Sequence, residues 1–116
     1  MPHDALPSRR IAVISRDGIG VNERFHRAAD CVVWERHGDV VRFVDRRALP
    51  ASPGRVFRDY LALATLVADC GWVVALAFSG EAKRELTARG FRLHEARGPI
   101  ASVIRALPAD SFTSPS

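Results

Sequence analysis

The chain has 116 residues and a mass of 12.7 kDa, which is enough for one hydrophobic core and too little for two. Its hydrophobic share of 47% and charged share of 26% are ordinary for a globular protein, with neither a signal-peptide pattern nor an apolar run of membrane-spanning length. A net charge of +4 and a pI near 10 favour anionic partners, and two isolated cysteines, Cys31 and Cys70, argue against a zinc or disulfide framework.

We expect a cytoplasmic chain in which one α/β domain at 9–107 follows a flexible leader at 1–8 and precedes a disordered tail at 108–116. The first predicted element is a strand at about 9–15, because Ile11-Ala12-Val13-Ile14 is an unbroken apolar run typical of a strand covered on both faces. The polar segment 16–26 after it predicts a loop. Ligands of open α/β sheets bind beyond the carboxyl ends of the strands, so this loop is the first candidate site.

The next two predicted strands form a hairpin. Residues 31–36 and 40–45 are rich in strand-forming side chains, and the short turn between them contains Gly38. A connector at 46–52 leads to a helix that begins at Ser52 and Pro53, a residue pair typical of a helix start. Apolar side chains at helical spacing continue this predicted helix to Ala68, and residues 69–71 end it.

A second unbroken apolar run at 72–78 predicts a second buried strand. Ser79 and Gly80 then open a predicted helix at 81–88, which Gly90 ends as a left-handed cap. Residues 91–95 alternate as a short strand near an edge. Gly98 and Pro99 are expected to start a final helix that ends at Pro108.

The predicted order is therefore β-β-β-α-β-α-β-α. Right-handed crossovers place the fourth strand beside the first and the hairpin on the first strand's other side. The fold class that follows is α/β, with a five-stranded mixed sheet and helices packed on it. Because the first and fourth strands are then neighbours, we expect Ser79 and Gly80 to lie opposite the 16–26 loop.

Several short motifs resemble one known family. They are the D-G and V-N-E-x-F-x-R-A pattern within 11–28, the D-C, apolar strand, glycine turn and A-x-x-x-L pattern within 69–90, and E-x-x-G-P-I at the start of 95–107. Together they resemble the dinitrogenase iron-molybdenum cofactor biosynthesis domain, the NifX, NifY and NafY group, which also forms the C-terminal part of NifB. The resemblance covers about residues 10–107.

This resemblance implies a ribonuclease H-like fold and a role in nitrogen fixation. It implies a non-enzymatic carrier that transiently binds an iron-sulfur cluster or iron-molybdenum cofactor precursor and works with nitrogenase cofactor assembly proteins. Such a cluster is anionic and needs cations, N–H donors and an imidazole or thiolate ligand. The candidate cofactor-binding residues are Arg16, Asp17, Arg24, His26, Ser79 and Gly80, and the candidate metal ligands are His26 and Cys70.

The chain departs from the family at one point. Many members have H-F-G where this chain has Arg24-Phe25-His26, and a guanidinium offers no lone pair to a metal. If residues 21–26 are extended, positions 24 and 26 point the same way and His26 takes over the place of the usual histidine; if they are tightly turned, the two positions diverge. Simpler readings make His26 a surface residue, Cys70 a core residue and Asp17 part of a turn.

Other function classes are alternatives to the carrier. One is a protein-interaction or regulatory domain of the same fold that has lost cluster binding. A nuclease is disfavoured because the first strand, Ile11 to Ile14, has no carboxylate for a metal ion, and a nucleic-acid surface of interleaved aromatic and basic residues is missing. A catalytic triad from Ser15 or Ser79 with His26 and Asp17 lacks a nucleophile-elbow motif. We therefore expect a binding protein and not an enzyme.

Overall fold

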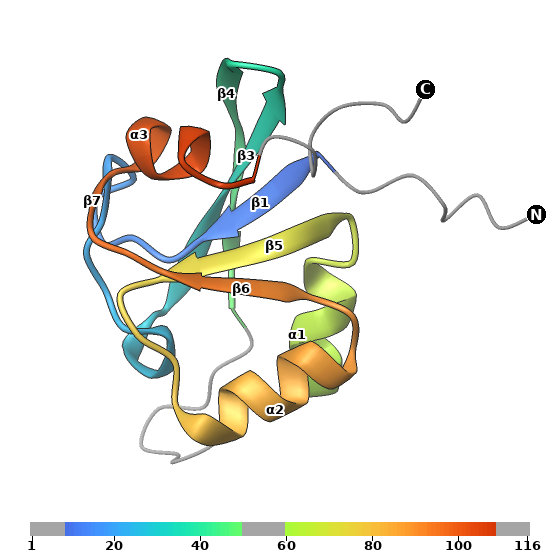
Figure 1. Ribbon diagram of the computed structural model, residues 1–116. Helices are drawn as coiled ribbons and strands as arrows, with labels where there is room; N and C mark the ends of the chain where they lie inside the picture. The colour runs from blue at the N-terminus through green and yellow to red at the C-terminus, as the bar shows by residue number, and fades with distance from the viewer. Residues whose placement is uncertain (1–8, 50–59, 109–116) are drawn as a thin grey trace, which may run out of the picture.

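The computed structural model describes residues 9–49 and 60–108 (Figure 1). The predicted leader at 1–8, the predicted helix start at Ser52 and Pro53, and the predicted tail from residue 109 lie outside the described residues. Within the described part, no helix is long and apolar enough to cross a membrane.

A five-stranded mixed sheet forms the centre of the molecule, in the order β4-β3-β1-β5-β6. β1 is antiparallel to β3 and parallel to β5, and β5 is parallel to β6. This confirms the predicted α/β fold class and the position of the fourth predicted strand beside the first, and the order is compatible with a ribonuclease H-like arrangement. The strands of this sheet are β1 (Arg10–Val13), β3 (Asp30–His37), β4 (Val40–Ala48), β5 (Cys70–Ala75) and β6 (Arg92–Glu95).

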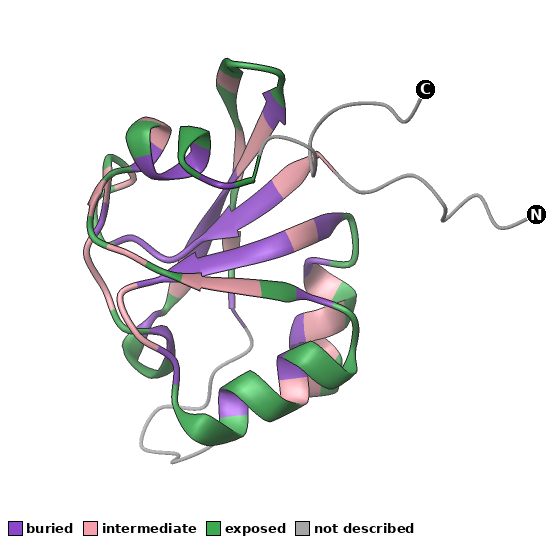
Figure 2. Ribbon diagram, in the orientation of Figure 1, coloured by how far each residue is buried: buried purple, intermediate pink, exposed green. Residues whose placement is uncertain are grey.

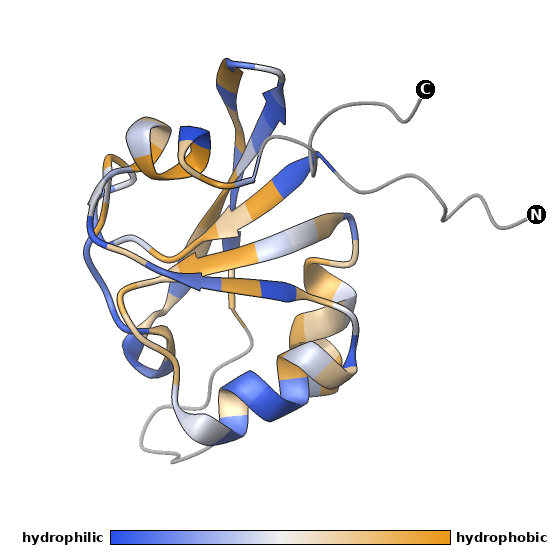
Figure 3. Ribbon diagram, in the orientation of Figure 1, coloured by the Kyte–Doolittle hydropathy of each residue, from blue (hydrophilic) through white to orange (hydrophobic). Residues whose placement is uncertain are grey.

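Both faces of the sheet are covered at its central strands β1 and β5, as the burial pattern in Figure 2 shows. Helices α1 (Tyr60–Leu66) and α2 (Gly80–Ala88) pack on one face, where Ile14, Val33 and Val73 are buried. Helix α3 (Ile100–Arg105) packs on the other face, against Val13 and Val74. Because β1 and β5 are covered on both sides, their second halves are apolar, and Figure 3 shows hydrophobic colours toward the carboxyl ends of both strands.

Helix α2 forms as its sequence predicts. The Ser79 side chain accepts a hydrogen bond from the Ala82 N–H at 3.1 Å, and so satisfies one of the free donors of the first turn. Gly90, just after the helix, has a φ of +95°, which glycine adopts without the strain that a side chain adds.

Several predicted boundaries are wrong. Residues 46–48 belong to β4 and not to a connector, and β5 begins at Cys70 and ends at Ala75, before the predicted end at 78. Gly98 and Pro99 lie directly before the last helix, with Pro99 as its N-cap, as predicted, but they have a second role. They form the short strand β7 (Gly98–Pro99), which pairs antiparallel with β2 (Gly20–Val21). β2 lies inside the segment 16–26, which the sequence predicts to be a loop. This two-stranded ribbon brings the loop after β1 to the end of β6.

The hairpin of β3 and β4 carries one buried charged side chain, that of Arg36. It is only 2% exposed, and its guanidinium donates hydrogen bonds to three backbone carbonyls: Gly38 at 2.6 Å, Ile104 at 2.8 Å and Leu107 at 3.0 Å. The last two lie at the carboxyl end of α3, where the helix carbonyls carry partial negative charge. Arg36 therefore fixes α3 to the sheet.

Candidate functional site

The segment after β1 is a loop organised by its own polar side chains. Asp17 accepts hydrogen bonds from the Ile19 and Gly20 N–H groups and from the Ser15 hydroxyl, and that hydroxyl in turn accepts from the Gly18 N–H at 2.8 Å. Gly18 has a φ of +79°, which the turn requires. Asp17 therefore stabilises the turn, as predicted. Its carboxylate points into the loop and binds backbone N–H groups there.

These contacts lower the pKa of Asp17 well below its usual range, because the Ile19 and Gly20 N–H groups bind the charged carboxylate. A carboxyl with a depressed folded pKa adds stability above its unfolded pKa and loses it as the pH falls towards the folded pKa. We therefore expect the melting temperature to fall below about pH 4. Asp17→Asn should melt lower at pH 7 and show a shallower acid dependence by circular dichroism. Equal slopes for both proteins below pH 4 would contradict this role.

Phe25 anchors the second half of the loop. Its side chain is 1% exposed, and its ring lies 5.4 Å from that of Phe78. On either side of Arg24, the backbone is tied to the segment after β5: the Leu76 N–H donates to the Glu23 carbonyl at 3.0 Å and the Phe25 N–H donates to the Ala77 carbonyl at 3.1 Å. These two backbone hydrogen bonds confirm that the first loop lies beside the end of β5, as predicted.

The two residues that flank Phe25 are both exposed, but they lie in different backbone conformations. Arg24 is extended, with φ −81° and ψ 143°, whereas His26 is inside the 3-10 helix η2 (Phe25–Arg27). An extended segment would have given positions 24 and 26 the same direction, and a helical turn does not. His26 is therefore an accessible imidazole beside Arg24, in a different orientation.

Three exposed arginines lie near the carboxyl ends of the parallel strands. Arg16 follows β1, Arg24 is tied beside the end of β5, and Arg97 follows β6; all three are exposed. Val21 pairs with Gly98, which places Arg97 next to the stretch that leads to Arg24. Within residues 9–49 and 60–108, none of these three side chains has an acidic partner. We call these three exposed arginines the arginine cluster.

Arg97 was not among the residues predicted from the sequence. It lies in a short stretch between β6 and β7, where an arginine reads as an ordinary surface residue. Only the pairing of β2 with β7 gives it a place beside the first loop. The E-x-x-G-P-I motif that contains it was noted for the resemblance and not for its charge.

Ser79 and Gly80 lie at the start of α2, directly after the segment that pairs with the loop. The Ser79 hydroxyl already accepts from Ala82, so its role in the described structure is that of a helix cap. Neither Ser79 nor Ser15 is hydrogen-bonded to His26 in the part of the chain that the structure describes. The four residues considered for a triad therefore do not form a nucleophile and base pair.

Both cysteines are buried in the core beneath α1. Cys31 is 1% exposed and Cys70 is 4% exposed, and both are free thiols. Burial raises the pKa of Cys31 to about 11, and burial together with the nearby Asp69 carboxylate raises the pKa of Cys70 to about 12. Across residues 9–49 and 60–108, no three His, Cys, Asp or Glu side chains gather as a metal site.

Burial and a raised pKa predict that both thiols are inert in the folded protein, since the thiolate is the reactive form. With iodoacetamide at pH 8, we expect no labelling of Cys31 or Cys70 by intact-mass spectrometry under native conditions and two labels after unfolding in guanidinium. Rapid labelling of Cys70 under native conditions would contradict the buried position of this thiol. It would show that the thiol is accessible to a metal ion.

Comparison with solved structures supports the same fold. The crystal structure of PH0822 has a TM-score of 0.61 and 20% identity, over 84% of this chain and 86% of that one. A structure from Methanocaldococcus jannaschii, mj0327, provisionally described as a dinitrogenase, has a TM-score of 0.56 and 9% identity, over 94% of this chain and 96% of that one. At these identities the likeness concerns the fold. No protein of curated function matches the chain.

A family model gives the closer relationship. The model described as dinitrogenase iron-molybdenum cofactor matches residues 8–110, a range that contains the whole sheet, the first loop and the arginine cluster. The resemblance noted from the short motifs is thereby confirmed. The chain belongs to the dinitrogenase iron-molybdenum cofactor family.

Proposed function

We propose that this protein is a non-enzymatic carrier of an anionic iron-sulfur cargo, the iron-molybdenum cofactor or one of its precursors, in nitrogenase cofactor assembly. The observation that supports this most is the arginine cluster: Arg16 and Arg24 come from the loop after β1 and Arg97 from the stretch after β6, all near the carboxyl ends of the parallel strands. This end of an open α/β sheet is the usual position of ligands.

The chemistry of these side chains suits binding better than catalysis. Guanidinium groups donate several hydrogen bonds to anionic sulfur or oxygen without ligating the metal. The exposed His26 supplies an imidazole that can ligate iron, and Asp17 and Phe25 hold the loop in one conformation. Cys70 is poorly suited as a ligand, because its thiol is buried and its pKa is raised.

A second candidate is a protein-interaction domain that has kept the fold without cluster binding. Two observations favour it: Arg24 stands where many family members have histidine, and neither thiol is accessible. In that case the protein would bind nitrogenase assembly proteins as partners and would carry no cargo.

An anaerobic titration with an iron-molybdenum cofactor precursor separates the two candidates. Absorbance and co-elution on gel filtration would measure binding to the wild type, His26→Ala and Cys70→Ala. We expect stoichiometric binding to the wild type and to Cys70→Ala, and weaker binding to His26→Ala. Equal binding by all three would assign the cargo to the arginine cluster and backbone N–H groups alone, and absence of binding to the wild type would overturn the carrier function.

A further inference from the structure

Asn22 lies in the middle of the loop after β1, and its side chain joins the two halves of that loop. The side-chain carbonyl accepts a hydrogen bond from the Arg16 N–H at 2.8 Å. The amide also interacts with the Asp17 carboxylate, and this contact contributes to the lowered pKa of Asp17. Because Arg24 follows two residues later, Asn22 links the backbone at Arg16 to the segment that carries Arg24.

The ribbon of β2 and β7 passes close to the same side chain. A Cβ atom on Gly20 would lie 3.4 Å from the Gly98 carbonyl oxygen and 3.7 Å from Nδ2 of Asn22, so the two strands approach each other beside this amide. Gly98 directly follows Arg97 and pairs with Val21. The amide of Asn22 therefore lies where the first loop meets the stretch that carries Arg97.

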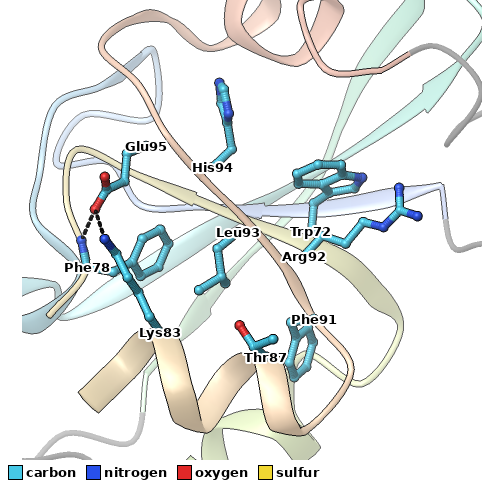
Figure 4. A pocket seen from close by; sticks show the side chains of 9 residues that line it. All are labelled: Trp72, Phe78, Lys83, Thr87, Phe91, Arg92, Leu93, His94 and Glu95. Carbon is cyan, nitrogen blue, oxygen red and sulfur yellow. Dashed lines mark hydrogen bonds and ion pairs between the residues drawn. The ribbon is translucent and has the colours of Figure 1, made fainter. Parts of the chain in front are cut away.

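Glu95 holds the other end of the stretch that carries Arg97. Its carboxylate accepts a hydrogen bond from the Phe78 N–H at 2.9 Å and lies 3.7 Å from the Lys83 ammonium, as Figure 4 shows. Phe78 belongs to the segment after β5, which is also bonded through its backbone to the loop after β1. Glu95 therefore links the connection after β6 to the connection after β5.

We propose that Asn22 and Glu95 are the positioning residues of the cargo site, because their contacts hold the backbone segments of the arginine cluster at one spacing. Asn22 is half-buried and Glu95 is exposed, so neither contributes mainly to the hydrophobic core. Side chains on separate segments bind one anion together at lower cost when the segments are already ordered. The role of both residues rests on the proposed carrier function, and it requires a cargo large enough to contact more than one of the three arginines.

Asn22→Ala tests the first contact with and without cargo. Without cargo, the Arg16 amide hydrogen should exchange roughly tenfold faster than in the wild type by NMR, because its acceptor is gone. In an anaerobic titration with an iron-molybdenum cofactor precursor, affinity should fall roughly tenfold. Arg16→Ala keeps the N–H but lacks the guanidinium, so in that background Asn22→Ala should change affinity by less than about twofold.

Glu95→Ala separates position from charge. By charge alone, loss of a carboxylate near the site should strengthen binding of an anion. Loss of the hydrogen bond to Phe78 should instead weaken binding of the same precursor, by roughly fivefold. Glu85→Ala is the matched control, since Glu85 lies on α2 and pairs with Arg89 at 2.6 Å, and we expect its affinity to stay within about twofold of the wild type.

The possible outcomes separate this role from the carrier function. If the wild type binds the precursor, the positioning role is overturned when Asn22→Ala binds as tightly, when Asn22→Ala causes its full loss in the Arg16→Ala background, or when Glu95→Ala does not bind more weakly. Unchanged hydrogen exchange at Arg16 overturns the role of Asn22 without any cargo. Absence of binding to the wild type overturns the carrier function, and the positioning role with it.

Discussion

Replacing Arg36 by methionine should lower the free energy of unfolding by about 3 kcal/mol, the largest effect that we expect from any single side chain. Methionine fills much of the same space but removes the charged donor that the Gly38, Ile104 and Leu107 carbonyls share. Hydrogen bonds from a charged donor contribute roughly 1.5 kcal/mol or more each, and without the two bonds to Ile104 and Leu107 α3 loses its attachment to the hairpin. Urea unfolding followed by circular dichroism measures the change.

Arg42→Met is the matched control for this experiment. Arg42 belongs to the same hairpin but is exposed and paired with Glu35 at 2.8 Å, so its loss should cost less than about 1 kcal/mol. A similar free-energy change for both variants would contradict the structural role of Arg36. In that case the three carbonyl contacts would add nothing beyond ordinary surface charge.

Reversing two charges of the arginine cluster should have the largest effect on cargo binding. We expect Arg24→Glu combined with Arg97→Glu to weaken binding of the anionic cargo by about 100-fold, since each reversal replaces an attraction near the surface by a repulsion. The effect should shrink as the salt concentration rises, because exposed charges are screened. An anaerobic titration at low and high salt gives both quantities.

The control changes the net charge by the same amount at a different place. Arg89 and Arg105 are exposed arginines on α2 and α3, away from the strand ends, and we expect Arg89→Glu with Arg105→Glu to keep cargo affinity within a few-fold of the wild type. If both double variants lose affinity equally, binding depends on overall charge, and the arginine cluster is not the site.

The central part of the fold could be predicted from the sequence because its signals are strong and local. The apolar runs of β1 and β5 indicate burial on both faces, and Ser79 and Gly90 mark the ends of α2 with side-chain and backbone chemistry. Together with the predicted hairpin and element order, the rule of right-handed crossovers then leads to the strand order.

Features that depend on distant partners could not be predicted. β2 and β7 have two residues each, too few for a periodic pattern, and they form only because the chain returns to the first loop. Arg36 reads as a surface arginine until α3 brings its carbonyl groups to it. β4 continues to Ala48 because β3 offers partners up to that point.

The candidate site follows the same pattern. The loop and the cationic residues Arg16 and Arg24 could be identified from their position after a buried strand. The orientation of His26 depends on η2, and the place of Arg97 depends on β7, so neither could be read from spacing. The resemblance to a family indicates which segment contains the candidate site. The structure shows which backbone segments lie next to one another there.

The most direct test of the carrier function is an anaerobic NMR titration of the ¹⁵N-labelled chain with a paramagnetic iron-sulfur cofactor precursor. Iron close to an amide broadens its signal, so the loss of signals maps the bound cargo. We predict that broadening is confined to residues 16–26, 76–80 and 96–98, around the arginine cluster, and that the amides of β4 and the carboxyl end of α2 stay sharp. Spectra that do not change, signals that broaden evenly over the whole chain, or broadening centred on another surface would contradict the proposed carrier function and its site.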